Sequence, residues 1–445
     1  MTRLADLVAH LEAEDKARIA PLVDTLIDLG LSPDLAAAAW LVPGRIEVLG
    51  KHTDYAGGRS LVAATEQGLA LVATAREDNR LRVIDVERRE IEETELRPDL
   101  ELPQGHWPVY PATVARRLAA NFPGDLQGAD IALASNLPSA AGLSSSSAFV
   151  VAIFLALAKV NSLEQRIEYR REIDTPEKLA GYLGAIENGS SFGDLEGDAG
   201  VGTFGGSEDH TAILCSRPAE LGQYRYAPVR LERSIPLPED LRFAIAASGV
   251  AAKKTGGARE QYNRLSTLAT EITAIWRRAR GTQARHLTAA LAEAAGSPDA
   301  IRAVLTATAE TTLSATELLR RFEHFLEEND EIVVGGGDSL AGGDLRTFGE
   351  MVDRSQRLAE ELLDNQIAET VLLQRSAREL GAVAASAFGA GFGGAVWALV
   401  EKDAIDRFVI TWSGRYLESF AEHQEKARFF TTAAGPGARE IEPLA

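Results

Sequence analysis

The stretch that decides the fold is PGRIEVLGKHTDYAGG, residues 43–58, which lies between two apolar runs. It holds four glycines and five charged or histidine side chains, namely Arg45, Glu47, Lys51, His52 and Asp54. A surface turn needs one or two glycines, whereas a wall around a small polar ligand needs polar side chains held close to bare backbone. The composition of this stretch therefore favours a binding loop over a solvated turn.

Length and charge limit the class of protein. The chain has 445 residues, 45% of them hydrophobic, so we expect two domains. A formal net charge of -19, from 65 acidic and 46 basic residues, disfavours nucleic acid and anionic membranes as partners. A single cysteine, Cys215, and an N-terminal stretch without an apolar core segment are typical of a cytoplasmic protein.

The hydrophobic pattern predicts mixed helices and strands. Residues 4–30 have apolar residues at helical spacing, and further helices are expected at 144–160, 175–189, 256–280, 298–328 and 344–380. Short apolar or alternating segments predict strands at 40–50, 60–77, 81–96, 130–138, 208–216 and 241–250, with 216–238 as a connection. Residues 381–412 predict a strand, a glycine loop, a second strand and a helix.

A second glycine-containing segment, NLPSAAGLSSSSAF at residues 136–149, runs from an expected strand into an apolar helix. Backbone N–H groups after Gly142 therefore lie at a helix N-terminus, where free amides and the helix dipole attract anions. Capping the helix needs one hydroxyl, whereas serines occupy all of 144–147. We expect a polyphosphate here, although the chain has no Walker A sequence and is not a P-loop protein.

A third segment, FGAGFGG at residues 388–394, contains the glycine spacing of a dinucleotide-binding loop. It lies near the end of the chain, follows a helical pattern and has no suitable acidic ribose-binding residue about 20 positions later. A Rossmann dehydrogenase is therefore disfavoured.

Taken together, the three segments resemble one family. Residues 43–58 resemble the galactokinase signature at its sugar-binding loop, 137–148 the phosphate loop of the GHMP kinase superfamily, and 388–399 its third motif. Further likeness covers 106–118, 260–265, 342–355 and 429–438. The chain is thus identified as a galactokinase-like member of the GHMP kinase superfamily, with the likeness spanning residues 37–438.

The resemblance implies an α/β (α+β) chain with the two-domain GHMP kinase fold and an active site between the domains. Residues 1–30 would be a helical extension, 31–235 a ribosomal-S5-like N-terminal domain, and 236–445 a C-terminal domain of helices over a sheet. It also implies a kinase that uses ATP and Mg²⁺ to phosphorylate the anomeric hydroxyl of galactose or a related sugar, and that is a monomer.

The resemblance assigns a role to each matching position. Asp209 and Arg45 would act in catalysis, and Ser144 and Glu187 would hold magnesium. Sugar contacts are expected from Lys51, His52, Asp54 and Tyr262. ATP contacts are expected from Trp107, Gly142, Leu143, Ser144, Ser145, Ser146, Gly389 and Gly391.

Departures from the family pattern leave the substrate open. Galactokinases generally have Glu at the position of Lys51 and Asn at that of Glu47, and His210 replaces a usual Gln. Lys51 would either contact an acidic group on the sugar or form a salt bridge to Glu47 or Glu208. The alternatives are a kinase for an acidic or N-acetylated galactose-like sugar, or a sugar and ATP sensor without turnover. Residues 188–208 would form a longer loop that acts as a lid or a specificity loop.

Overall fold

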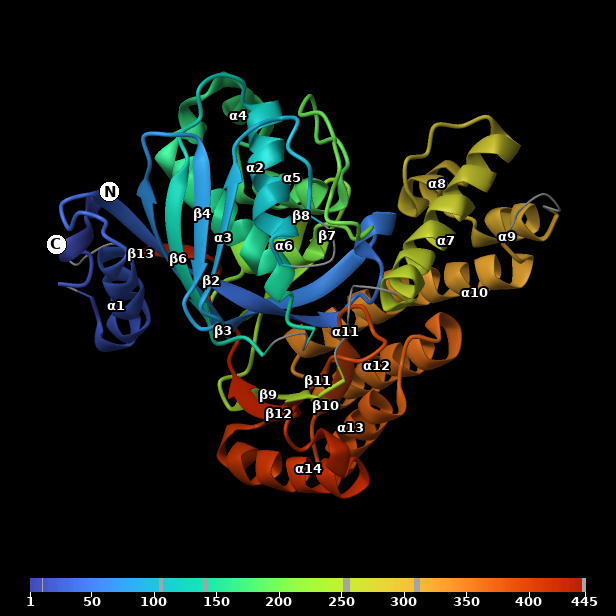
Figure 1. Cartoon of the computed structure of the whole chain (residues 1–445). Coiled ribbons are helices and arrows are strands. Elements are labelled where there is room, and N and C mark those ends of the chain that lie inside the picture. Colours follow the sequence, from blue (N-terminus) through green and yellow to red (C-terminus); the bar gives the residue numbers. More distant parts are fainter. Residues whose placement is uncertain (10, 104–106, 139–141, 251–256, 308–312, 442–445) are drawn as a thin grey trace.

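The computed structural model describes residues 1–9, 11–103, 107–138, 142–250, 257–307 and 313–441. A first sheet with its helices, a second sheet with its helices and a lobe of helices beside them make up these residues (Figure 1). The mixed fold with two sheets agrees with the expected fold class.

Among the described residues, nine strands form the first sheet, in the order β1-β2-β3-β6-β4-β5, with β13 paired to β2 and the β7–β8 hairpin paired to β3. These strands are β1 (Thr2–Arg3), β2 (Ala36–Leu49), β3 (Arg59–Ala75), β4 (Arg80–Asp85), β5 (Glu90–Glu95), β6 (Ala129–Ser135), β7 (Glu220–Arg225), β8 (Arg230–Pro236) and β13 (Arg439–Ile441). The helices packed around it are α1 (Ala13–Asp28), α2 (Val109–Asn121), α3 (Ser145–Val160), α4 (Ile167–Glu172), α5 (Pro176–Asn188) and α6 (Glu208–Cys215).

Alternation along β2 explains why helices cover both faces of this sheet. Ala37, Ala39 and Leu41 pack with the apolar side of α1. The intervening Trp40 and Val42 point to the opposite face, where α3 lies. Both sets are buried, so β2 reads as a continuous apolar run rather than as an alternating one.

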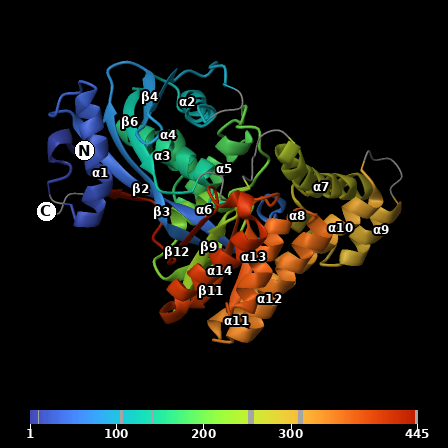
Figure 2. The ribbon, with the colours of Figure 1, turned by 60° about the horizontal axis from the view of Figure 1, so that its bottom comes forward.

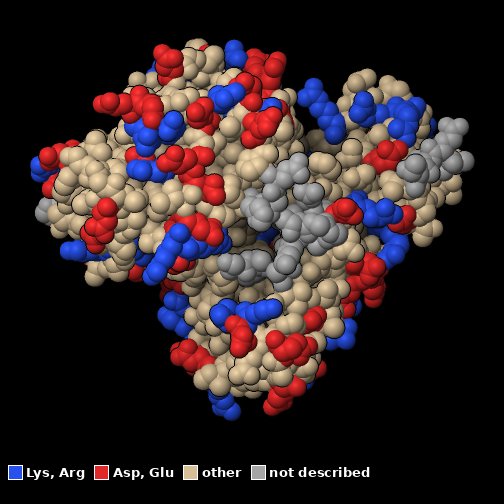
Figure 3. Space-filling model, in the orientation of Figure 1, with Lys and Arg blue, Asp and Glu red and all other residues tan. Residues whose placement is uncertain are grey.

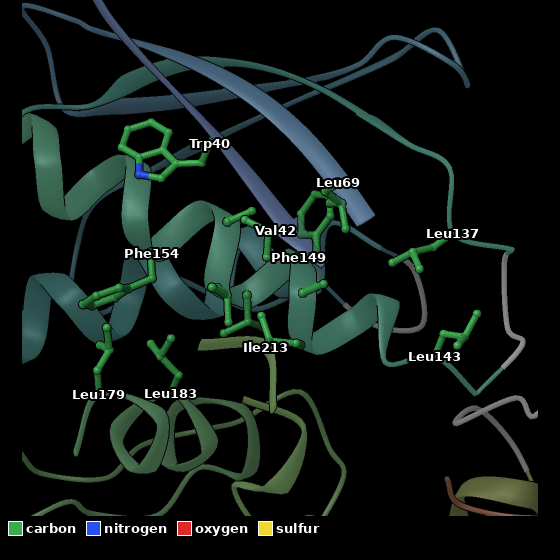
Figure 4. Close-up of a cluster of buried hydrophobic side chains, with 14 of the residues drawn as sticks. Trp40, Val42, Leu69, Leu137, Leu143, Phe149, Phe154, Leu179, Leu183 and Ile213 are labelled. Carbon is green, nitrogen blue, oxygen red and sulfur yellow. The ribbon is translucent and has the colours of Figure 1, made fainter. Parts of the chain in front are cut away.

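The apolar helix α3 lies at the centre of the larger core. Figure 4 shows Trp40 and Val42 of β2 and Leu69 of β3 close to Phe149 and Phe154 of α3. Leu179 and Leu183 of α5 and Ile213 of α6 close the cluster from the other side. Because α3 is held by this core, its N-terminal serines are fixed in position.

The second sheet has the order β10-β11-β9-β12, all antiparallel. Its strands are β9 (Leu241–Ala247), β10 (Ala384–Phe388), β11 (Ala395–Glu401) and β12 (Arg428–Thr432). The helices beside it are α11 (Val333–Ala341), α12 (Leu345–Leu358), α13 (Ala368–Glu379) and α14 (Ile405–Ser419). One face packs on α13 and α14, while the other joins the core of the first sheet through residues such as Phe243 and Trp397.

The helical lobe consists of α7 (Gly257–Arg280), α8 (Leu287–Glu293), α9 (Pro298–Ala307) and α10 (Ala315–Leu326). It projects to one side of the two sheets in both ribbon views (Figures 1 and 2). Its apolar cluster includes Ala56, with Tyr55 packed against it, so the lobe contacts the residue 43–58 loop directly.

Two expectations about local structure were wrong. Residues 208–216 are not a strand, because Glu208–Cys215 form α6. The apolar run at residues 212–215 is so short that it is compatible with a strand as well as with a buried helix. Residues 216–238 are more than a connection, since they contain the β7–β8 hairpin.

The expected division at residue 235 stays a prediction, and the last strand bears on it. After the second sheet the chain returns to the first, where β13 pairs with Ala39–Leu41 of β2.

No helix in the described part of the chain is long and apolar enough to cross a membrane. On the face shown in Figure 3, described acidic and basic side chains are interspersed rather than gathered in a basic patch.

Candidate functional site

A cavity of about 290 Å³ lies where the first sheet, the helical lobe and the loop after β10 meet. Its lining comes from β2, the residue 43–58 loop, the N-terminus of α3, α5, α6, α7 and residues 203–206. Carboxyl groups dominate the charged lining, with Glu47, Asp54, Glu187, Glu208 and Asp209 facing a single guanidinium, Arg45, among the described residues.

Arg45 and Asp209 form the central ion pair of the cavity. Arg45 Nε lies 2.6 Å from Asp209 Oδ1, and Arg45 Nη1 donates a hydrogen bond to Gly142 O at 2.6 Å. The pairing register between β2 and β3 shifts on each side of Arg45 and Glu47, an irregularity that re-aims side chains. Burial lowers the pKa of Arg45, but the surrounding carboxylates raise it further, so Arg45 stays charged.

Glu47 and Glu208 lie beside this pair and are each 4% exposed. Burial raises the pKa of Glu47 to about 7, despite the opposing charges of Arg45 and Lys51. Burial, reinforced by the charge of Glu47, raises the pKa of Glu208 well above its ordinary value. Both shifts favour the protonated form, so Glu47 and Glu208 hold a proton at higher pH than ordinary glutamates do.

The serine segment borders the cavity at the start of α3. Ser144, Ser145, Ser146 and Ser147 all line it, together with Gly142. Ser144 adopts a left-handed backbone with φ of 56° and its side chain makes no capping hydrogen bond. The serine run is therefore not explained by helix capping. Residues 139–141 of the predicted phosphate loop lie outside the described residues.

Glu187 of α5 belongs to a buried polar cluster next to the serines. Its Oε2 accepts a hydrogen bond from Ser147 Oγ at 2.7 Å and lies 3.1 Å from His210 Nε2. Ser147 Oγ is also 3.3 Å from Asp209 Oδ2. Glu187 thus faces inward and is not a plain surface residue, and Ser147 links it to Asp209.

The residue 43–58 loop supplies the opposite wall. His52 Nδ1 lies 3.0 Å from Tyr55 Oη, and the ring centroids of His52 and Tyr262 are 5.5 Å apart. Asp54 Oδ2 accepts a hydrogen bond from the backbone N–H of Glu208 at 3.2 Å. Burial raises the pKa of Asp54 against these hydrogen bonds. The structure therefore brings three of the four predicted sugar contacts to the cavity.

Lys51 is the exception, because its side chain does not line the cavity, and its predicted sugar contact stays a prediction. The side chain is 1% exposed and lies outside the cavity lining. Its ammonium donates to Ser355 Oγ of α12 at 3.2 Å, and Ser355 Oγ donates to Glu328 Oε1 at 2.9 Å. Glu328 Oε1 also accepts from the backbone N–H groups of Gly50 at 2.8 Å and Lys51 at 3.2 Å.

Lys51 lies outside the cavity lining because its side chain contacts groups packed behind the loop. Glu328 lies in a π-helical turn, Glu327–Ile332, and is fully buried. A buried carboxylate needs donors and a nearby cation, and the loop provides both. The internal hydrogen bonding of Lys51 therefore goes to Ser355 and Glu328 rather than to Glu47 or Glu208.

The third glycine segment meets the serine segment across the cavity. A Cβ on Gly389 would lie 3.3 Å from Gly142 O and 3.6 Å from Arg45 Nη2. Gly389 and Ala390 line the cavity, while Gly391 packs against Asn365, which a Cβ at residue 391 would reach at 2.4 Å. Glycine is required here because the two loops approach with positive φ angles.

Besides Gly391, two predicted ATP contacts lie outside the cavity lining. Leu143 has its side chain in the core, and its backbone carbonyl accepts from Arg45 N at 3.2 Å. Trp107 donates to Glu90 Oε2 at 2.6 Å and packs edge-on against Phe149. Their roles toward a nucleotide stay predictions.

Sequence reasoning missed several residues that shape the site. Asn365 is 1% exposed, and its Nδ2 lies 3.3 Å from His52 Nε2 and 3.4 Å from Ala390 O. Buried Arg321 of α10 donates to His52 O and Tyr55 Oη. Arg321 comes from α10 and Asn365 from the connection before α13, both distant in sequence from His52, so no local pattern signals them. Of Glu47 and Glu208, only Glu47 was signalled, by its departure from the family pattern.

Comparison with known proteins places these features in a family. The chain matches the GHMP kinases N terminal domain at residues 109–194, the galactokinase galactose-binding signature at 32–75 and the GHMP kinases C terminal domain at 338–415. It is 29% identical to a galactokinase of Chloroflexus aggregans over 84% of this chain and 86% of the relative. It is 28% identical to a galactokinase of Streptomyces coelicolor over 90% and 94%.

Solved structures share the fold. A Lactococcus lactis galactokinase complexed with galactose has a TM-score of 0.75 at 21% identity, covering 95% of this chain and 99% of the other. Methanococcus jannaschii mevalonate kinase has a TM-score of 0.54 at 12% identity, covering 90% and 99%. The two sheets and the serine-lined helix start therefore define a GHMP kinase. Within that superfamily, the chain belongs to the galactokinase-like members.

The position of Lys51 predicts an effect on stability. Replacing Lys51 by Glu brings a second carboxylate to buried Glu328 and should lower the free energy of unfolding by about 3 kcal/mol, as when a buried charge loses its counter-charge. Denaturant unfolding of the parent and Lys51→Glu measures this. Lys159→Glu is the matched control, because Lys159 pairs with Glu440 at the surface and should cost about 1 kcal/mol or less. Equal stability of parent and Lys51→Glu would contradict the assignment.

Proposed function

We propose that this chain is an ATP-dependent galactose kinase, which converts galactose and ATP to galactose 1-phosphate and ADP. The proposal is supported by galactokinase relatives that match more than four fifths of the chain and by the galactose-binding signature over residues 32–75. The likeness in fold to the galactokinase structure covers both sheets and the segments that line the cavity. It therefore includes the parts that would bind each substrate.

The observation that carries the proposal is the Arg45–Asp209 ion pair. It lies in the cavity that the serine segment and the residues after β2 line from different sides. In the proposed reaction the sugar O1 attacks the γ-phosphorus while the bond to the ADP oxygen breaks. Asp209 accepts the hydroxyl proton, and Arg45 stabilises the charge on the transferring phosphoryl group. Phosphoryl transfer depends mainly on positioning and charge, which these two side chains supply.

The serine segment is the proposed site of the ATP phosphates. Free amides at the start of α3 and the hydroxyls of Ser144–Ser147 offer donors to phosphate oxygens. Ser144 and Glu187 would hold Mg²⁺, since their oxygens are of the kind that this ion prefers and few protein ligands are needed. When bound, the ion would neutralise phosphate charge. The described residues contain no group of three or more acidic, histidine or cysteine side chains that could hold a metal by itself, so ATP would bring it.

His52, Asp54 and Tyr262 are the proposed sugar contacts. Two of them offer hydrogen-bond acceptors or donors to ring hydroxyls, and the tyrosine ring packs beside His52. Asn365 would act as a positioning residue for His52. A monomeric state and a cytoplasmic location stay predictions.

The alternative substrates and the silent sensor are not favoured. A sugar carboxylate would enter a cavity where five carboxyl groups face one guanidinium, so it would be repelled. Lys51, the cation that would attract such a carboxylate, lies outside the cavity lining. The relatives that match most of the chain are galactokinases, and Arg45 and Asp209, the side chains proposed for turnover, are paired at the cavity.

An assay of ADP release with galactose, galacturonate and N-acetylgalactosamine tests the function. We expect ATP- and magnesium-dependent turnover with galactose as the preferred sugar, and loss of turnover in Asp209→Asn with ATP binding nearly intact, because the change removes charge from the hydroxyl side. Glu93→Gln on exposed β5 is the control. Absence of ADP release with galactose would contradict the proposal. Retained turnover in Asp209→Asn with loss in Glu208→Gln would assign the proton acceptor to Glu208.

The position of Asn365 predicts an effect on sugar binding. Asn365→Val replaces the amide beside His52 and Ala390 by an apolar side chain of similar size. Losing one hydrogen bond of about 1 kcal/mol should raise KM for galactose roughly fivefold with a smaller change in kcat. Steady-state kinetics measures both constants. Asn161→Ala, a helix-end change on the far end of α3, should leave KM unchanged, and an equal effect in the two variants would refute a role specific to His52.

A further inference from the structure

Two buried glutamates meet at the floor of the cavity. Glu47 comes from β2 and Glu208 from the start of α6; both line the cavity beside Arg45, and their carboxyl groups are close enough to share a hydrogen bond. Each is 4% exposed, and Glu47 Oε1 and Glu208 Oε1 find no hydrogen-bond donor among the described residues. Two carboxylate groups are both acceptors, so a hydrogen bond between them requires a proton.

The charged groups around Glu47 and Glu208 also favour a proton on this pair. Arg45 Nε lies 3.6 Å from Glu208 Oε1 and is already paired with Asp209 Oδ1 at 2.6 Å. The two glutamates are also within electrostatic reach of Lys51 beyond β2 and Asp54 in the loop. Burial and, after it, the charge of Glu208 raise the pKa of Tyr226, which follows β7. Four carboxyl groups around one buried guanidinium cannot all be ionised without a large cost.

We propose that Glu47 and Glu208 share one proton and act as positioning residues that keep Arg45 available to the transferring phosphoryl group. The inference rests on the proposed kinase function. With one proton, the couple carries a single negative charge, so Asp209 and the couple place two negative charges against the Arg45 guanidinium rather than three. Without the proton, a further anion stands beside Arg45, competes for it and repels the incoming phosphate.

The two glutamates titrate as a pair, and their surroundings set the direction in which their pKa values shift. The raised pKa values of the two groups keep the shared proton bound to about neutral pH or above, rather than to the ordinary glutamate range. The kinase should therefore lose activity on the alkaline side as the couple deprotonates. Because the folded chain binds more protons than the unfolded chain above the ordinary glutamate pKa, the couple should also lower stability as pH rises through about 7.

A readout that needs no enzymatic activity tests the shared proton first. Infrared spectroscopy of the full-length protein in heavy water at neutral pH should show a protonated carboxyl C=O band that weakens in Glu208→Gln and in Glu47→Gln. The control Glu93→Gln should leave the band unchanged. A band of equal strength in parent and both variants would overturn the proposal, whatever the enzymatic activity turns out to be.

Kinetics then tests the link to Arg45. In the parent, kcat/KM for galactose should fall about tenfold for each pH unit above the apparent pKa of the couple. Gln at position 208 donates permanently to Glu47, so Glu208→Gln keeps the hydrogen bond and cannot lose a shared proton. The ratio of its kcat/KM at alkaline pH to that at neutral pH should therefore be at least several times the parent ratio.

Each outcome separates the two proposals. If the infrared band depends on both glutamates but no sugar is phosphorylated, the proposed function fails and the couple stands. If the parent is active and the alkaline ratio is the same in the parent, Glu208→Gln and Glu93→Gln, the couple does not act on Arg45 and the inference fails. A merely structural role would lower activity at every pH without changing that ratio.

Discussion

The ion pair between Arg45 and Asp209 is the interaction on which the site depends, because it joins parts of the chain that are far apart. Arg45 is carried by the central strand β2, and Asp209 by the first turn of α6. Through Gly142 O the guanidinium also fixes the loop that leads into α3. The phosphate side and the sugar side of the proposed reaction therefore share one charged centre, and its net charge decides how strongly it can hold a phosphoryl group.

The residue 43–58 loop is held from behind by groups that never reach the cavity. Glu328 binds the backbone of Gly50 and Lys51, and the ammonium of Lys51 completes the arrangement through Ser355. Arg321 holds the carbonyl of His52. Because these contacts come from the helical lobe and from α12, the geometry of the proposed sugar contacts depends on how the lobe and the second sheet pack against β2.

Much of the fold and part of the site could be predicted from the sequence, because local patterns encode them. Apolar periodicity indicated α3 and the strands around it, and the family resemblance indicated the fold class. The resemblance did not predict the contacts of Lys51 with Ser355 and Glu328, since a motif gives a position but not the direction in which a new side chain turns. The helix at Glu208–Cys215 was missed because its apolar run is too short to show a helical period. Asn365 depends on long-range packing that no local pattern records.

The most direct test of this account is a crystal structure of the chain with galactose and a non-hydrolysable ATP analogue. The account predicts the anomeric hydroxyl within hydrogen-bond distance of Asp209, the γ-phosphate at Arg45 and the start of α3, and Lys51 still bonded to Ser355 without touching the sugar. A sugar bound against Lys51, or a phosphate chain remote from the serines of α3, would contradict it.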